Sequence, residues 1–212
     1  LVLPAVRLPG AAGSGVTSGQ NDTVILERPN TNITVTLSSG AHNVRKLYVR
    51  ETLNIIGGSL IVNYAPAADS TTNGAQISGP VTLSNSASFS VHTLQVDTNR
   101  IFTLAGGALA FNHINLMPHA STPAKILVNG DVSFASLSNV TAVIAKGAGA
   151  GNSGLIDLGA GNRVLTVGNG LVDVDLSLDV PISNGGLTKS GAATLRLTSI
   201  NSYTNGTTVS AG

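Results

Sequence analysis

The chain has 212 residues, of which 42% are hydrophobic and only 10% are charged, and its formal net charge is +1. This length suits one domain or one extended repeat array, and the hydrophobic content excludes a disordered tail. So small a net charge argues against nucleic-acid binding, which needs a basic surface. Because the chain has no Cys, thiolate metal sites and Cys nucleophiles are excluded.

The interior must be built from small and branched side chains. Aromatic residues make up 3% of the chain, there is no Trp, and Gly occurs 25 times. The interior is therefore expected to consist of thin, regular layers of Val, Leu, Ile and Ala. The surface is then mainly Ser, Thr, Asn and Gly, which favours an exported bacterial protein, extracellular or on the cell surface. We expect no membrane insertion, because no stretch reads as a membrane-spanning helix.

The first twenty residues differ from the rest. The apolar segment "LVLPAVRLP" (1–9) is followed by the small-residue linker "GAAGSGVTSGQ" (10–20). We therefore divide the chain into an N-terminal arm with its linker, residues 1–20, and one domain, residues 21–212. The arm either folds back as a cap on its own domain or docks on a neighbouring molecule. In the second case its contact residues would be Leu1, Val2, Leu3, Val6 and Leu8.

From residue 33 onward the apolar pattern alternates, with the period of two that predicts half-buried strands. Each run is short and bounded by Gly, Asn, Ser or Pro. This pattern predicts an all-β protein. The predicted strands lie at 33–37, 45–49, 59–62, 81–83, 102–104, 114–116, 125–128, 131–134, 141–144, 155–158, 163–167, 171–180, 194–197 and 207–209.

An internal repeat favours one arrangement of these strands. "VRKLYVRETLNIIGGSLIV" (44–62) aligns with "VHTLQVDTNRIFTLAGGALAF" (91–111), so that Leu47 matches Leu94 at an offset of 94 − 47 = 47. Such an offset suits two rungs of a β-solenoid, at about 20–25 residues per rung. A β-sandwich is the alternative, since it also uses short alternating strands. The repeat and the scarcity of aromatic residues favour the solenoid.

The last residues, "GGLTKSGAATLRLTSINSYTNGTTVSAG" (185–212), carry a recognisable pattern. They resemble the autotransporter-associated β-strand repeat, although Ala193 stands where that repeat has a second turn Gly. The matching positions are Gly185, Gly186, Leu187, Thr188, Lys189, Gly191, Thr194, Leu195, Leu197, Asn201, Tyr203, Gly206, Thr208, Val209 and Gly212. The resemblance implies a right-handed parallel β-helix in a bacterial surface protein, and an architectural role.

Few residues suggest chemistry. Asp173, Asp175 and Asp179 alternate with apolar residues in "LVDVDLSLDV" (171–180), so a strand there would place all three on its outward face. Such a row could hold Ca²⁺ or supply an acid/base pair, or it could serve solubility. The four histidines, at 42, 92, 113 and 119, lack the spacing of a zinc site. We therefore predict no enzyme activity, no cofactor and no metal.

The leading functional hypothesis is a structural subunit of an extracellular filament, assembled head to tail from copies of this chain. An uncovered solenoid end exposes strand edges that another copy could pair with. The predicted C-terminal stacking residues are Leu195, Leu197, Tyr203, Thr208 and Val209, and the N-terminal arm would act as a donor strand. Surface or matrix polysaccharide is a further candidate partner. The alternatives are a stalk or passenger segment of an adhesin and, third, a polysaccharide-degrading β-helix enzyme.

Overall fold

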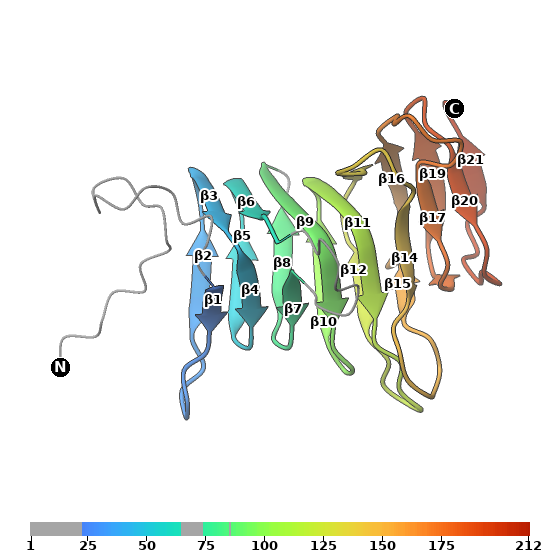
Figure 1. Cartoon of the computed structure of the whole chain (residues 1–212). Helices are drawn as coiled ribbons and strands as arrows, with labels where there is room; N and C mark the ends of the chain where they lie inside the picture. Colours follow the sequence, from blue (N-terminus) through green and yellow to red (C-terminus); the bar gives the residue numbers. More distant parts are fainter. Residues whose placement is uncertain (1–22, 65–73, 85) are drawn as a thin grey trace.

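A computed structural model describes residues 23–64, 74–84 and 86–212. These residues form 21 β-strands and no helix, and every pairing between the strands is parallel. Figure 1 shows the strands following one another along a single axis, from β1 at one end to β21 at the other. The described part of the chain therefore contains no helix that could cross a membrane.

The strands lie on three faces around this axis. Face one holds β1 (Thr23–Leu26), β4 (Lys46–Val49), β7 (Ala75–Ile77), the second halves of β9 (Ala87–Val96) and β11 (Ala108–Leu116), β14 (Ala142–Lys146), β17 (Leu176–Leu178) and β20 (Leu195–Leu197). Face two holds β2 (Thr34–Leu37), β5 (Thr52–Ile55), β8 (Val81–Ser84), β10 (Ile101–Ala105), β12 (Lys125–Val128), β15 (Leu155–Asp157) and β18 (Ile182–Ser183). Face three holds β3 (Ala41–Val44), β6 (Gly58–Val62), the first halves of β9 and β11, β13 (Val132–Ala135), β16 (Asn162–Val167), β19 (Gly186–Ser190) and β21 (Thr207–Val209).

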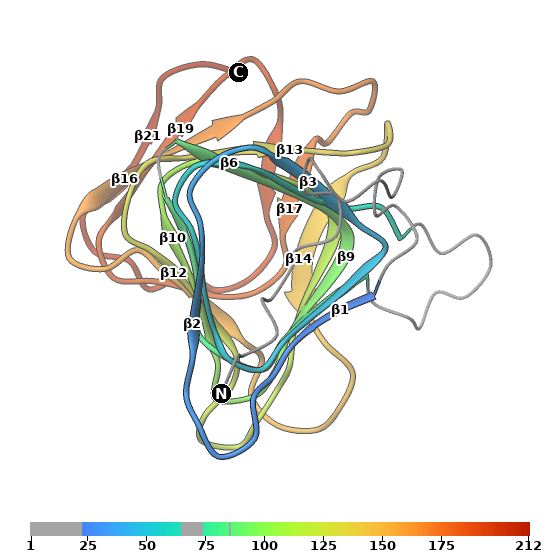
Figure 2. The same cartoon turned by 90° about the vertical axis from the view of Figure 1, so that its left-hand side faces the viewer.

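One circuit through the three faces is called a rung, and the described residues make eight of them. Rung 1 is β1, β2 and β3, and rung 8 runs from β20 to β21 through a bridge between Ser183 and Ser202 on face two. Seen from the N-terminal end in Figure 2, the chain runs clockwise as it recedes, which makes the helix right-handed. Sandwich sheets are antiparallel, so the parallel pairing of successive rungs confirms the predicted β-helix.

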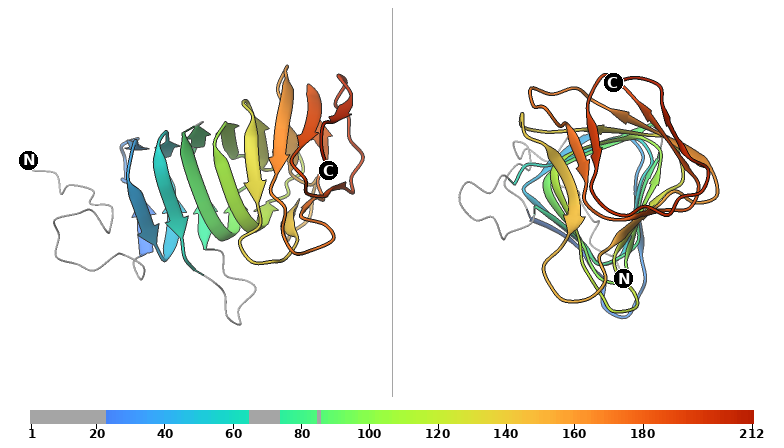
Figure 3. Two further views of the ribbon diagram at one scale, coloured as in Figure 1. Left: turned by 90° about the horizontal axis from the view of Figure 1, so that it is seen from above. Right: turned by 90° about the vertical axis from the view of Figure 1, so that its right-hand side faces the viewer.

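The internal repeat corresponds to stacking two rungs apart. Leu47 pairs with Ala75, and Ala75 pairs with Leu94 on the next rung. The predicted offset of 47 is therefore the sum of one long rung, 75 − 47 = 28 residues, and one short rung, 94 − 75 = 19 residues. Rungs differ in length because residues are inserted at the corners, while the strands keep their register. Figure 3 (left) shows the rungs succeeding one another along the axis.

The core is one continuous column of inward side chains. All four phenylalanines lie in it, each at most 3% exposed. Phe89 packs edge to face on Phe102, with ring centroids 6.3 Å apart, and Phe111 packs likewise on Phe134 at 6.0 Å. Edge-to-face pairs of this kind contribute beyond the apolar area that they bury. The four phenylalanines of the chain are therefore concentrated in the middle rungs.

One predicted strand is largely wrong. Residues 171–180 were expected to alternate as a single strand, but only Leu176–Leu178 form one, β17. Residues 168–175 form the corner between faces three and one. The reason is Asp175, whose carboxylate accepts the backbone N–H of Gly170 at 2.6 Å and so closes the preceding segment into a loop. Strands β1 and β3, which the alternation did not single out, complete rung 1.

Candidate functional site

The C-terminal rung is the part of the structure where the core column opens. In rung 7 the inward Leu176 and Leu178 of face one are each 1% exposed, whereas Leu195 and Leu197, which pair with them in rung 8, are only half-buried. Val209 of β21 is 65% exposed. A cavity of about 270 Å³ opens at this end, and its walls include Leu187, Lys189, Ala193, Leu195, Leu197 and Val209. Figure 3 (right) looks onto this end of the helix.

The five predicted stacking residues do not all face this cavity. Leu195, Leu197 and Val209 line it, and Tyr203 packs against the core with its hydroxyl 2.6 Å from the Thr207 hydroxyl. Thr208 pairs with the outward Thr188, so it alternates away from the cavity, which Thr207 lines instead. The role of these residues in assembly stays a prediction. The predicted arm residues Leu1, Val2, Leu3, Val6 and Leu8 lie outside the described residues.

The two ends of the helix differ. In rung 1 the inward Leu26, Leu37 and Val44 are at most 4% exposed. Among the described strands the ends are alike in backbone pairing, because β1 pairs only with β4, and β21 pairs only with β19. Within the described residues both ends therefore present strand edges, and the C-terminal end adds the half-buried Leu195 and Leu197 and the exposed Val209.

Polar contacts fasten rung 8 to rung 7 along face one. Asp175, which is 3% exposed, accepts the backbone N–H of Thr194 at 2.8 Å with its second carboxylate oxygen. Arg196 donates to the hydroxyl of Ser177 at 3.0 Å, and Thr198 donates to Asp179 at 2.8 Å. Buried charges of this kind need such hydrogen bonds to offset the loss of water. Sequence reasoning missed them because it placed the acids on a solvent-facing strand.

The three acids of the predicted row therefore do not form a cluster on one wet face. Asp173 is exposed, Asp175 is buried and bonded to two backbone N–H groups, and Asp179 is half-buried and accepts two hydroxyls. The acid/base or Ca²⁺ interpretation of this row is not supported by this geometry. Within the described residues, no three His, Cys, Asp or Glu side chains come together as a metal site would require.

Lys189 is the unexpected member of this region. It lies on the inward side of β19, in register with Leu165 of the rung before and Val209 of the rung after, and is 5% exposed. Its ammonium donates to the carbonyls of Gly191, at 2.5 Å, and Ala211, at 2.7 Å. The sequence signal that could have predicted this inward position is the alternation itself, since Leu187 and Lys189 fall on the same side of the strand.

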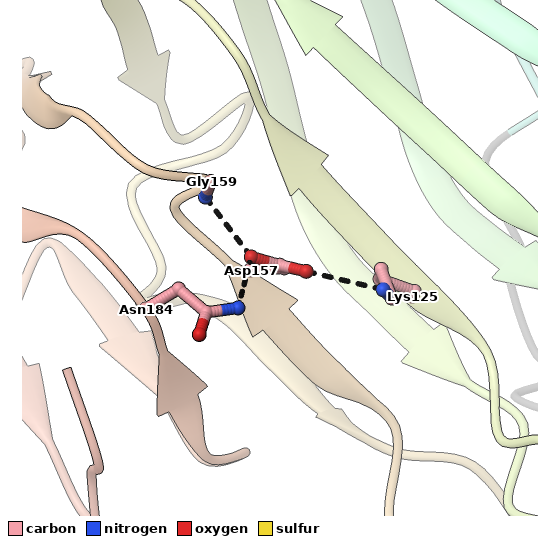
Figure 4. Close-up of polar contacts among 4 residues, drawn as sticks. All are labelled: Lys125, Asp157, Gly159 and Asn184. Atoms are coloured by element: carbon pink, nitrogen blue, oxygen red, sulfur yellow. Dashed lines mark hydrogen bonds and ion pairs between the residues drawn. The ribbon is translucent and has the colours of Figure 1, made fainter.

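A second polar cluster joins rungs 5, 6 and 7 at the corner between faces two and three (Figure 4). Asp157 accepts Lys125 at 3.1 Å, the N–H of Gly159 at 2.9 Å and the amide of Asn184 at 2.8 Å. Burial alone would raise the pKa of Asp157, but the hydrogen bonds from Asn184, Gly159 and Lys125 together outweigh it and lower the pKa. An open cavity of about 500 Å³ lies beside this carboxylate. The cluster contains no nucleophile, and its carboxylate is engaged on both oxygens.

The histidines are separate from one another. His92 and His113 lie on neighbouring rungs, but His113 pairs with Thr93, so the two are offset by one residue, and His92 contacts Asn112 at 3.0 Å. Burial lowers the pKa of His113. His119 accepts the N–H groups of Ser121 and Thr122 within its own loop. These contacts stabilise loops and corners and do not assemble a catalytic site.

The comparisons with known proteins bear on the same rung. The family described as passenger-associated-transport-repeat matches residues 187–212, the segment that closes rung 7 and forms rung 8. This match agrees with the resemblance drawn from the sequence. The comparisons with curated proteins and with solved structures gave no significant match. The C-terminal segment is therefore a repeat of the passenger type, built into a parallel β-helix.

Proposed function

We propose that the chain is a rigid, non-catalytic β-helical segment of a bacterial surface protein, of the kind found in exported passengers. The observation that carries this proposal is that the matched repeat, residues 187–212, continues the ladder that begins at β1, with the same three faces and the same register. A helix whose rungs are all joined by parallel ladders is a stiff, extended spacer. Its outward Ser, Thr and Asn side chains suit contact with water.

Cell fractionation tests the proposed location. Antibodies against the purified protein should find it in the medium or at the outer surface of the cells that make it. Proteinase K added to intact cells should remove the surface signal while a cytosolic marker stays intact. Protein that resists the protease until the cells are lysed would contradict the proposal. Intact-mass measurement of the native protein adds the adhesin test, since a stalk segment belongs to a chain extending well past residue 212.

A second proposal, head-to-tail stacking of copies into a filament, is favoured by the open end of rung 8. The edges of β20 and β21 and the 270 Å³ apolar cavity would be covered by rung 1 of the next copy. Because the inward Leu26, Leu37 and Val44 of rung 1 are already buried, that copy would contribute mainly backbone pairing. The contact is heterologous and does not close, so it would propagate into a fibre.

Sedimentation velocity and negative-stain microscopy over rising protein concentration test this second proposal. Val209→Lys should abolish assembly, because it places a charge on the exposed end of the core. Ile200→Lys is the matched control: Ile200 is 93% exposed but does not line the cavity. Deleting residues 1–12 asks separately whether the N-terminal arm takes part; a folded monomer without fibres is expected. A wild-type protein that stays monomeric throughout would refute stacking and leave the proposed surface location untouched.

A further inference from the structure

We propose that Lys189 is a specificity-determining residue for rung stacking: its buried ammonium holds the following rung by a backbone carbonyl and, together with the neighbouring backbone carbonyls, admits only glycine at position 212. This inference rests on the proposed structural role of the chain. It adds to that role a rule for which rung can lie on which.

The charge of Lys189 lies in the core. The Lys189 side chain occupies a place in the core column that Leu165 and Val132 fill in the two preceding rungs. Among the described residues, the ion pairs join Arg50 to Glu27 and Lys125 to Asp157, so no carboxylate neutralises Lys189. A buried ammonium without a counter-ion is costly unless its hydrogens are bonded. Here the carbonyls of Gly191 and Ala211 provide that compensation.

The two carbonyls that accept the Lys189 ammonium belong to different rungs. Gly191 follows β19 directly, whereas Ala211 lies beyond β21, one rung further on. The ammonium therefore joins the two ends of the matched repeat. The neighbouring N–H of Ser210 donates to the Lys189 carbonyl at 2.9 Å, so backbone and side chain of Lys189 hold the same short segment.

Gly212 has no room for a side chain. A Cβ added there would overlap the Lys189 ammonium and would lie 2.6 Å from the carbonyl oxygen of Ala193. Real Cβ atoms do not approach backbone oxygens so closely, so any side chain at 212 must displace either the ammonium or the rung. Gly206 provides the comparison: it has a similar positive φ, 80° against 102°, yet a Cβ there meets nothing within 4 Å. Backbone strain is thus similar at both glycines, while the collision is confined to Gly212.

The buried lysine limits which rungs can stack on this end of the helix. A rung stacked over an inward lysine of this kind, in this chain or in a second copy, must present a carbonyl and then a glycine at the matching positions. Rungs with a side chain there are excluded. The lysine thus fixes which segment covers it, as a buried polar group fixes register in other repetitive assemblies.

A mutant cycle read by amide hydrogen exchange tests the proposal. Gly212→Ala and Gly206→Ala are each made in the wild-type and Lys189→Ala backgrounds, all with the purification tag after Gly212 so that no chain-end carboxylate lies beside residue 189. The readouts are the Ser210 amide, for rung 8, and the Ile114 amide, for the middle rungs. Lys189→Ala and Gly212→Ala should each speed exchange at Ser210 by about tenfold or more, since each removes a charge-assisted hydrogen bond.

The expected signature is non-additivity. Once Lys189 is replaced by Ala, Gly212→Ala should speed exchange at Ser210 less than it does in the wild-type background, because only the close approach to the backbone carbonyls of Ala193 and Gly191 remains. Gly206→Ala should have the same effect in both backgrounds. If the fold-increases in Ser210 exchange caused by Lys189→Ala and by Gly212→Ala simply multiply in the double variant, the proposal is overturned. Faster exchange at Ile114 in Lys189→Ala would overturn it too, because Lys189 would then support the whole core. Proteinase K treatment of intact cells and sedimentation velocity do not depend on hydrogen exchange at Ser210. The proposed function and the proposed role of Lys189 can therefore fail separately.

Discussion

The middle rungs and the last rung share one backbone ladder but are held by different side chains. In rungs 3 to 5, Phe111 and its neighbours fill the column completely, and Leu94, Ile114 and Leu116 have no exposed surface. In rung 8 the column is open, and the links to rung 7 are polar: Asp175 to Thr194, Arg196 to Ser177, and Lys189 to Ala211. The same ladder is thus reinforced by apolar packing in one place and by individual hydrogen bonds in the other.

Stability is therefore not uniform along this β-helix. In repeat proteins each rung is stabilised by its own interior and by its two neighbours, so an end rung with one neighbour and an open interior should unfold first. The polar links of rung 8 then decide how readily it opens. The middle rungs should respond to mutation as one unit, and rung 8 should respond alone.

The largest effect is expected from the middle. Phe111→Ala removes a fully buried ring that packs on Phe134, and should lower the free energy of unfolding by about 3–5 kcal/mol. Denaturant unfolding measures this change. Ile200→Ala, at a residue 93% exposed, should change stability by less than about 0.5 kcal/mol. A Phe111→Ala protein that loses only local protection near rung 4 would show that the middle rungs do not act as a unit.

A smaller and local effect is expected from Asp175→Ala. The change leaves the N–H groups of Gly170 and Thr194 without their acceptor, which costs about 1–3 kcal/mol. Hydrogen exchange should speed up at Thr194 and along β20, while β9 and β11 keep their protection. Asp173→Ala is the matched control, since Asp173 is an exposed acid two residues away. Equal effects of the two substitutions would mean that charge, not the buried hydrogen bonds, fastens rung 8.

The fold could be predicted from the sequence because its information is periodic. Alternating apolar residues predicted the strands, and the match of Leu47 with Leu94 predicted stacking, which the structure confirms through Ala75. The final repeat was recognisable because its glycines and its Asn-x-Tyr spacing are specific. These signals depend on position in the chain and not on contacts at a distance.

The polar links could not be predicted, because they depend on contacts that alternation does not encode. Asp175 reads as outward in "LVDVDLSLDV", yet its bond to Gly170 turns the preceding residues into a loop. Lys189 stands at an inward position of the strand alternation, but a lysine side chain is rarely buried. Its burial is tolerable here because the carbonyls of Gly191 and Ala211 accept hydrogen bonds from its ammonium. The partner positions lie 194 − 175 = 19 and 211 − 189 = 22 residues away, one rung on, and become visible only once the register is known.

The smallest effect concerns pH and the links between rungs 5, 6 and 7. The hydrogen bonds to Asp157 lower its pKa in the folded protein below the ordinary value of 3.8. The unfolded chain therefore takes up this proton first as pH falls. The stabilisation is present above pH 3.8 and is lost as pH falls through the folded pKa. Because the carboxylate keeps contact with water through the open corner cavity, the effect should be modest.

Thermal unfolding between neutral pH and about pH 3 measures it. In Asp157→Asn the melting temperature should fall less steeply below about pH 4 than in the wild type, while the two curves run parallel from pH 6 to 8. Asp173→Asn, which changes an exposed acid, should follow the wild-type curve. If Asp157→Asn retained the full acid sensitivity, the carboxylate would not be a significant link between rungs.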